Sequence, residues 1–307
     1  MNKKEWNIFF KRNIYRYTVN KLCGIHRIKK LKCNKFLEKM IEYKLIIEYF
    51  FFKRIYIPQI EFTITTNCTL KCKDCINYIP LISKKEQINV SFQEFKNNLY
   101  NILRPIARLQ SLILIGGEPL LNRNLCNMLQ YSLKQKKIEN IYIITNGTIS
   151  FSSELINILK NNNNKVTVWI SNYTTNEELV KIIKSKDIIK KLKYNKIKYI
   201  FQKDLFWFKT SPIKFKNRTK EQNIDYFEKC LNPCVSILDQ KMFVCPRAGI
   251  FHLKKIINSG NKEFLDLSKK INKNDIINFY SNNDFSACNF CSSLNDCKYH
   301  VKPAIQL

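Results

Sequence analysis

The stretch IEFTITTNCTLKCKDC, residues 60–75, joins an apolar run to a loop that contains three cysteines. The run IEFTITT (60–66) is short and rich in β-branched and aromatic residues, which predicts a strand. Cys68, Cys72 and Cys75 follow it with gaps of three and two residues, and the loop holds no histidine and no fourth cysteine. Because structural zinc sites and iron–sulfur clusters normally have four protein ligands, three thiols indicate a metal site with one open position.

On both sides of this loop, short apolar runs alternate with longer amphipathic ones. A helix is predicted over 91–109, where Ser91 and Glu94 form a capping box. Apolar strands that alternate with helices are typical of a parallel sheet covered by helices, so the fold class is α/β, a layered or barrel domain. Further strands are predicted at 111–117, 140–147, 165–173 and 197–201, and further helices at 122–137, 153–162 and 175–191.

Three motifs of glycine or polar residues follow the next strands: GGEP (116–119), TNG (145–147) and SNY (171–173). In parallel α/β folds the chemistry lies at the carboxyl ends of the strands, so we expect these motifs to surround the cysteine loop. Gly116 and Gly117 would let the backbone come close to a ligand. An isolated GGEP is also typical of a tight strand-to-helix turn with a capping glutamate.

The segment CTLKCKDC (68–75) resembles the CxxxCxxC loop of the radical S-adenosylmethionine (SAM) superfamily, and GGEPLL (116–121) resembles its second hallmark. The resemblance implies a partial (β/α)6 TIM-type barrel in which the three cysteines hold a 4Fe-4S cluster. SAM would complete the fourth iron through its amino and carboxylate groups. The resemblance thus assigns the metal to Cys68, Cys72 and Cys75, and SAM to Gly116, Gly117, Glu118, Pro119, Asn146 and Ser171. It assigns no catalytic side chain.

Two features depart from the superfamily pattern. The residue before the third cysteine is often aromatic in that superfamily, whereas here it is Asp74. No glycine-rich, adenine-contacting motif is found on the fifth strand around 197–201 either. Both departures concern contacts with SAM and leave the cluster ligands unaffected.

A second group of cysteines follows residue 228. CLNPCVSILDQKMFVCPRAG (230–249) predicts two strands joined by an Asp239–Gln240 turn, which would make Cys234 and Cys245 cross-strand partners. Together with Cys288 and Cys291 they supply four thiols, and spacing alone allows zinc as well as a cluster. The segment resembles the SPASM or shortened twitch domain of radical SAM enzymes, but Val301 stands where the fuller pattern has a cysteine, which implies one auxiliary 4Fe-4S cluster. The ligands are interpreted as Cys234, Cys245, Cys288 and Cys291, with Cys230 and Cys297 as alternates.

Three regions are predicted: a basic helical N-terminal extension (1–56), a radical SAM core (57–228) and an auxiliary cluster domain (229–307). The extension predicts two amphipathic helices, which either pack on the core or contact a membrane surface or an acidic partner. The chain carries a net charge of +29 but spreads it thinly, so no specific nucleic-acid partner is predicted. The N-terminus has no signal-peptide pattern and no stretch is long enough to span a membrane, which predicts a cytoplasmic protein.

The resemblance implies an enzyme that reductively cleaves SAM to a 5′-deoxyadenosyl radical and abstracts hydrogen from a substrate. The reductant would be an external one-electron donor of the flavodoxin or ferredoxin type. The substrate would be a sugar or nucleotide-linked metabolite, or a side chain of a peptide or protein. Trp207 and the basic residues of 201–220 would suit an anionic substrate. The alternative is an iron–sulfur electron carrier or a zinc module on nucleic acid.

Overall fold

The computed structural model describes residues 16–18, 35–202, 206–230, 234–258, 260, 262–292 and 300–307. Its centre is a sheet in which five parallel strands lie side by side in chain order. All residues of the first and fourth of these strands are buried, as expected for strands covered on both faces. The prediction of an α/β fold with a parallel sheet is confirmed. The five strands are β2 (Ile60–Thr65), β3 (Arg108–Gly116), β4 (Ile138–Thr145), β5 (Val166–Ile170) and β6 (Tyr199–Phe201).

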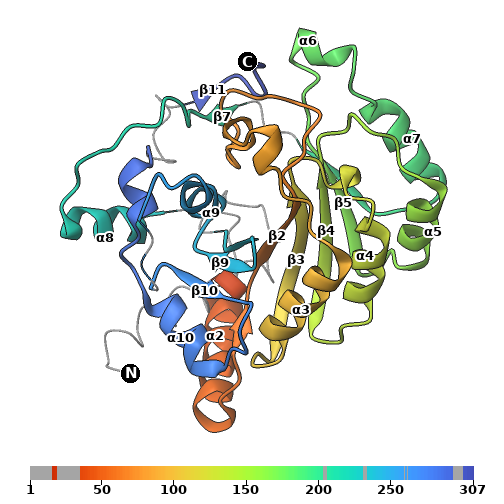
Figure 1. Cartoon of the computed structure of the whole chain (residues 1–307). Helices are drawn as coiled ribbons and strands as arrows, with labels where there is room; N and C mark the ends of the chain where they lie inside the picture. The colour runs from red at the N-terminus through yellow and green to blue at the C-terminus, as the bar shows by residue number, and fades with distance from the viewer. Residues whose placement is uncertain are drawn as a thin grey trace.

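Helices cover one side of this sheet (Figure 1). The first begins at Ser91, whose hydroxyl accepts a hydrogen bond from the backbone N–H of Glu94 at 3.2 Å, and it ends shortly before Pro105. The helix predicted over 175–191 is two helices, because the chain turns between them and the Lys184 N–H donates to the Gly147 carbonyl at 2.7 Å. The helices are α3 (Phe92–Leu103), α4 (Leu125–Leu133), α5 (Ser153–Asn161), α6 (Glu177–Val180) and α7 (Ser185–Tyr194).

The cysteine-rich C-terminal region extends the same sheet. β8 (Ser236–Leu238) runs parallel to β2, with Ser236 opposite Glu61, and β9 (Lys241–Phe243) and β10 (Phe264–Asp266) follow in antiparallel order. The predicted count of six βα units is therefore not confirmed. Five strands follow in chain order, and the next parallel position beside β2 is taken by a strand from the region predicted as a separate domain.

The hairpin between β8 and β9 has the predicted two-residue turn. Asp239 and Gln240 have φ values of 48° and 54°, and both residues have positive φ in a type I′ turn. Leu238 pairs with Lys241 directly across it. Three helices accompany this hairpin: α8 (Lys220–Glu228), α9 (Pro246–Leu253) and α10 (Lys273–Ser281).

Of the predicted N-terminal extension, the structure describes a long helix and three earlier residues. α2 (Lys35–Phe52) lies at the end of the sheet opposite to β11 (His300–Val301) (Figure 1). The helix predicted around residues 6–17 falls mostly outside the described residues, so a wholly helical extension is not confirmed. No described helix has the length and apolar character needed to cross a membrane. The remaining elements are β1 (Tyr56–Ile57), β7 (Trp207–Phe208), η1 (Ile79–Leu81), η2 (Lys84–Glu86), η3 (Pro119–Leu121) and η4 (Ser286–Phe290).

The two cysteine regions share an apolar core. Tyr78, Ile79 and Ile82, which follow the first cysteine loop, pack with Phe251 and Phe285 of the C-terminal region. The Tyr78 and Phe251 ring centroids are 5.0 Å apart. The C-terminal region therefore packs directly against the chain that leaves the first cysteine loop.

Candidate metal and cofactor site

The loops that follow β2, β3, β4 and β5 meet at one end of the sheet. The Glu118 backbone N–H donates to the Asn67 carbonyl at 2.8 Å, which joins the GGEP turn to the start of the cysteine loop. The Ser171 N–H donates to the Thr145 carbonyl at 2.9 Å, which joins the SNY segment to the TNG turn. The four motifs singled out in the sequence therefore form one continuous surface.

The two glycines of GGEP are required by contact within the chain. A Cβ on Gly116 would lie 2.0 Å from the Thr65 carbonyl oxygen, and one on Gly117 would lie 2.2 Å from the Asn67 carbonyl oxygen. Both contacts are with backbone atoms, so a side chain at either glycine would force the chain at the start of the cysteine loop to shift. The predicted contact of these glycines with SAM stays a prediction, and the structure shows in addition that both glycines lie against the chain itself. The glycines let β3 hold the cysteine loop in position.

Glu118 is fully buried and connects two of the loops. Its carboxylate accepts hydrogen bonds from the Thr145 hydroxyl at 2.9 Å, the Asn146 backbone N–H at 2.8 Å and the Leu120 backbone N–H at 3.2 Å. Burial raises the pKa of this carboxyl to about 7, and these hydrogen bonds oppose the shift. Glu118 therefore fixes the turn, as predicted for it.

Asn146 points toward the first cysteine. Its amide nitrogen lies 3.0 Å from the Thr69 hydroxyl and 3.7 Å from the Cys68 sulfur, and its amide oxygen accepts from Thr148 at 2.7 Å. The predicted contact of this side chain with SAM stays a prediction, and the hydrogen bonds that the structure shows for it lie within the protein. It orients Cys68 and the residue after it.

The three thiols of the loop are close enough to influence one another electrostatically. Burial raises the pKa of Cys68 to about 11 and of Cys72 to about 12, and it also raises the pKa of Cys75. In the metal-free chain these thiols therefore keep their protons near neutral pH, and a metal has to displace them.

The donor set fits an iron–sulfur cluster. Among the described residues, no three His, Cys, Asp or Glu side chains lie close enough to share a single metal ion. Cysteine thiolates are the usual ligands of iron–sulfur clusters, and this loop supplies three of them. The Asn67 side-chain oxygen beside Cys68 is buried and has no hydrogen-bond partner among the described residues, so an acceptor is available to a bound group.

Other residues noted in the sequence also lie at this site. The Asp74 carboxylate accepts from the Thr210 N–H at 2.8 Å and from the Ser211 N–H at 2.9 Å, so this departure from the superfamily pattern anchors the segment 210–211 over the loop. Tyr173 is buried beside the loop, with its ring 5.7 Å from that of Trp207. Burial raises the pKa of Tyr173, and the loop thiols add to the shift. Ser171 forms a hydrogen bond with this tyrosine.

The C-terminal cysteines come from separate segments. The hairpin ladder ends where Ser236 pairs with Phe243, so the predicted cross-strand pairing of Cys234 with Cys245 stays a prediction, and the electrostatic neighbours of the two thiols differ. Cys245 interacts with Cys291 and Cys230, and Cys234 interacts with Cys230 and with Glu61 of β2. Cys230 is therefore close enough to influence both thiols electrostatically. Cys297 lies outside the described residues.

Two arginines belong to this second group. The Arg218 guanidinium donates to the carbonyls of Cys288 at 2.7 Å and Cys291 at 2.9 Å, and it lies 3.9 Å from the centre of the Tyr226 ring. Arg247 is buried with its charge toward Cys245 and Cys291. Burial lowers the pKa of Arg247, but the facing thiols and Tyr78 raise it more, so the net shift is upward.

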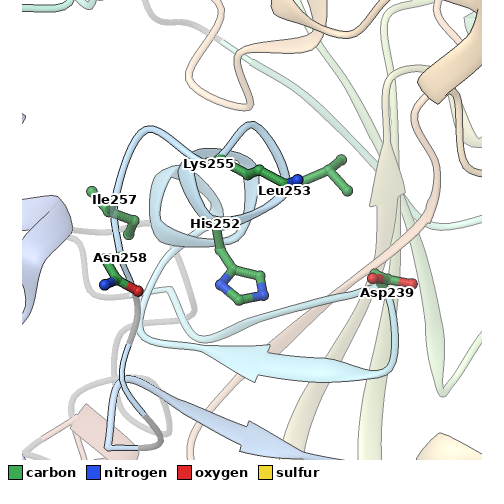
Figure 2. A pocket seen from close by; sticks show the side chains of 6 residues that line it. All are labelled: Asp239, His252, Leu253, Lys255, Ile257 and Asn258. Carbon is green, nitrogen blue, oxygen red and sulfur yellow. The ribbon is translucent and has the colours of Figure 1, made fainter.

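A pocket of about 500 Å³ lies away from both cysteine groups. Figure 2 shows it between the end of α9 and the hairpin turn, with His252 and Asp239 on its walls. Cys245 caps the opposite end of α9, and none of the predicted site residues lines this pocket. The pocket is not the candidate site.

Comparison with known proteins adds a family description. Residues 61–154 match a family model described as a 4Fe-4S single cluster domain. This range contains Cys68, Cys72, Cys75 and the GGEP and TNG motifs, and none of the C-terminal cysteines. The match agrees with the radical SAM resemblance and confirms the prediction of a 4Fe-4S cluster for this part of the chain. No curated protein matches the chain.

Solved structures give remote matches. The structure of anSMEcpe with bound AdoMet and the Cp18Cys peptide is 17% identical, with a TM-score of 0.36, over 47% of this chain and 42% of that one. Streptococcus suis SuiB bound to S-adenosylmethionine is 18% identical, with a TM-score of 0.38, over 73% and 49%. Methylornithine synthase (PylB) is 11% identical, with a TM-score of 0.31, over 65% and 57%. The matches span about half the length of these other chains.

Proposed function

We propose that this chain is a radical SAM enzyme. Cys68, Cys72 and Cys75 would hold a 4Fe-4S cluster with one iron open to SAM, and the bound cluster and SAM would supply a 5′-deoxyadenosyl radical for hydrogen abstraction. The observation that carries the proposal is three thiols on one loop, one of them buried and two half-buried, with the loop packed against two glycines that tolerate no side chain. The family description of the same residues as a 4Fe-4S single cluster domain supports it.

The protein's own residues would position the reactants and exclude water. Gly116 and Gly117 fix the cysteine loop, Glu118 fixes the turn beside it, and Asn146 orients Cys68. SAM would lie against the GGEP backbone and near Ser171, with the Asn67 oxygen as a free acceptor. Tyr173 and Trp207 would form an apolar wall that keeps water from the radical.

The C-terminal cysteines would hold one auxiliary 4Fe-4S cluster. Cys234, Cys245, Cys288 and Cys291 are the proposed ligands, with Cys230 and Cys297 as alternates, and the electrostatic influence of Cys230 on Cys234 and Cys245 supports Cys230 as one of them. The choice of a cluster over zinc follows the resemblance to a SPASM or twitch domain. The cluster would exchange an electron with the first site or anchor substrate.

The substrate class extends the proposal. A sugar or nucleotide-linked metabolite and a peptide or protein side chain both fit a site of this kind, and the basic residues of 206–220 favour an anionic group. The reductant would be a flavodoxin or ferredoxin, and the protein would act in the cytoplasm. A simple electron carrier is not favoured, because it has no use for a three-cysteine site braced by the GGEP turn.

The test is SAM cleavage. The chain is reconstituted anaerobically with iron and sulfide, reduced with dithionite and given SAM, and 5′-deoxyadenosine is quantified. We expect product from the wild type and from Cys126→Ala, whose cysteine lies on α4 outside both groups, and a loss of at least about 100-fold in Cys72→Ala. No product from a wild-type protein that carries its cluster, or undiminished product from Cys72→Ala, would refute the proposal.

A further inference from the structure

The segment Ala304–Leu307 pairs with the cysteine loop although it lies more than 200 residues away in the sequence. The Lys73 N–H donates to the Ile305 carbonyl at 2.8 Å, and the Leu307 N–H donates to the Lys71 carbonyl at 2.9 Å. These two bonds flank an antiparallel bridge between Cys72 and Gln306. The backbone on both sides of the second cysteine is therefore held by this distant segment.

The side chain of Gln306 completes the contact. Its amide nitrogen donates to the Cys72 sulfur at 3.3 Å and to the Ala304 carbonyl at 2.6 Å, and its amide oxygen accepts from the Lys71 N–H at 2.9 Å. The amide is fixed at both ends, so one N–H remains directed at the sulfur. Cys72 is only 7% exposed, the least of the three loop cysteines.

Independent contacts hold the segment in place. Ala304 is fully buried, and its carbonyl also accepts from the Asn176 side chain at 2.9 Å. Just before it, β11 pairs with β7, with His300 opposite Phe208. Figure 1 shows β7 and β11 together at the end of the sheet where the C-terminus lies. The position of Gln306 therefore does not depend on Cys72 alone.

A donor at this sulfur has a defined electrostatic effect. Reduction of a cluster adds negative charge, part of which is carried by the ligand sulfurs. An N–H directed at a ligand sulfur stabilises the reduced form more than the oxidised form, so it raises the reduction potential. A buried position strengthens the effect, because less water screens the amide dipole.

We propose that Ala304–Leu307 is part of the metal centre: its backbone fixes the cysteine loop around Cys72, and Gln306 is a positioning residue whose N–H···S bond raises the reduction potential of the cluster. The proposal rests on the proposed function only in that Cys72 is a cluster ligand.

The main experiment is an EPR-monitored redox titration of the reconstituted first cluster, identified by its response to SAM. Gln306→Leu removes the donor, and Gln306→Glu removes it while keeping an acceptor for the Lys71 N–H. We expect a more negative potential in Gln306→Leu at unchanged iron content. The matched control is Gln59→Leu, since the Gln59 amide donates to Cys234 of the second group at 3.2 Å, and it should leave the first potential unchanged. A wild-type potential in fully loaded Gln306→Leu would overturn the proposal.

A second measurement works without metal. In the metal-free full chain, the rate at which an alkylating reagent labels Cys72 is followed by mass spectrometry, with Cys75 of the same loop as internal reference. Leu307→Pro, which removes one pairing N–H, should speed labelling of Cys72 several-fold and that of Cys75 less. Equal rates in the wild type and Leu307→Pro would show that the segment does not hold the loop. Because this readout needs no cluster, it separates failure of this proposal from failure of the proposed function.

Discussion

The first cysteine loop and the second cysteine group differ in where their thiols come from. Cys68, Cys72 and Cys75 lie on eight consecutive residues, and the bonds that shape the loop come from the neighbouring strand ends. The second group collects its thiols between residues 230 and 291, from the two ends of a hairpin and a 3-10 turn. The spacing of the cysteines therefore identifies the first site in the sequence, whereas the second site depends on how distant segments pack.

The two regions also differ in charge. Glu118 and Asp74 lie near the first loop, whereas Arg247 faces the thiols of the second group and Arg218 holds its backbone. Positive charge near a cluster stabilises its reduced, more anionic state. We therefore expect the first cluster to have the lower potential, which suits reductive cleavage of SAM, and the second to accept an electron more readily.

Gly117→Ala is the most direct test of the difference between the two cysteine regions. The new methyl group would lie 2.2 Å from the Asn67 carbonyl oxygen and 2.8 Å from the Cys68 Cβ, so the cysteine loop has to shift. We expect loss of the EPR signal that responds to SAM, persistence of the second signal, and a free energy of unfolding lower by about 1–3 kcal/mol. Gly260→Ala is the matched control, since no atom of the described residues other than its chain neighbours lies within 4 Å of a Cβ there. If Gly117→Ala bound as much iron at the first site as the wild type does, the close approach of Gly117 to the Asn67 carbonyl would not determine the shape of the loop.

Arg218→Lys should have the opposite selectivity, since it should affect the second cysteine group and spare the first. A lysine ammonium cannot reproduce the two directed hydrogen bonds of the guanidinium to the Cys288 and Cys291 carbonyls. The backbone of the second cysteine group is then held less firmly. We expect iron at the second site to fall several-fold while SAM-responsive iron at the first site is retained, as measured by Mössbauer spectroscopy. Arg123→Lys, on an exposed arginine near α4, should change neither. Parallel loss at both sites would show that the two groups assemble as one unit.

The sequence predicted the local features well. The five parallel strands, the Ser91 cap and the Asp239–Gln240 turn follow from periodicity, a hydroxyl at the right position and the residues of a tight turn. The meeting of the four strand-end motifs follows from the rule for parallel sheets. Each of these needs only a few neighbouring residues, so the sequence carries the information directly.

The remaining features depend on contacts between distant segments. Nothing in the sequence around β8 indicates that it pairs with β2, and because of this pairing the predicted count of six units is not confirmed. Gln306 lies in a short tail with no motif, and Asp74 was noted only as a departure from a pattern. The choice between Cys230 and its neighbours as ligands also depends on how the hairpin packs, so spacing left it open.

The smallest expected effect concerns Glu118 and the pH dependence of stability in the metal-free chain. Its pKa is about 7 in the folded chain against 4.5 for the ordinary carboxyl, because burial disfavours the charged form. Between these values the folded chain binds the proton more tightly than the unfolded chain. The stability that this group contributes is therefore complete below about pH 4.5 and is lost as the pH rises through 7.

Glu118→Gln removes this titration, so the free energy of unfolding, measured by denaturant titration from pH 5 to about 8, should fall less steeply than in the wild type. Glu61 of β2, buried beside Cys234, also has a pKa of about 7, so the slope is reduced and not abolished. Glu177→Gln, at the exposed start of α6, controls for the loss of one carboxylate. An unchanged slope in Glu118→Gln would mean that the bonds from Thr145 and Asn146 keep Glu118 ionised, and the anionic character of the first region would then be greater than its burial indicates.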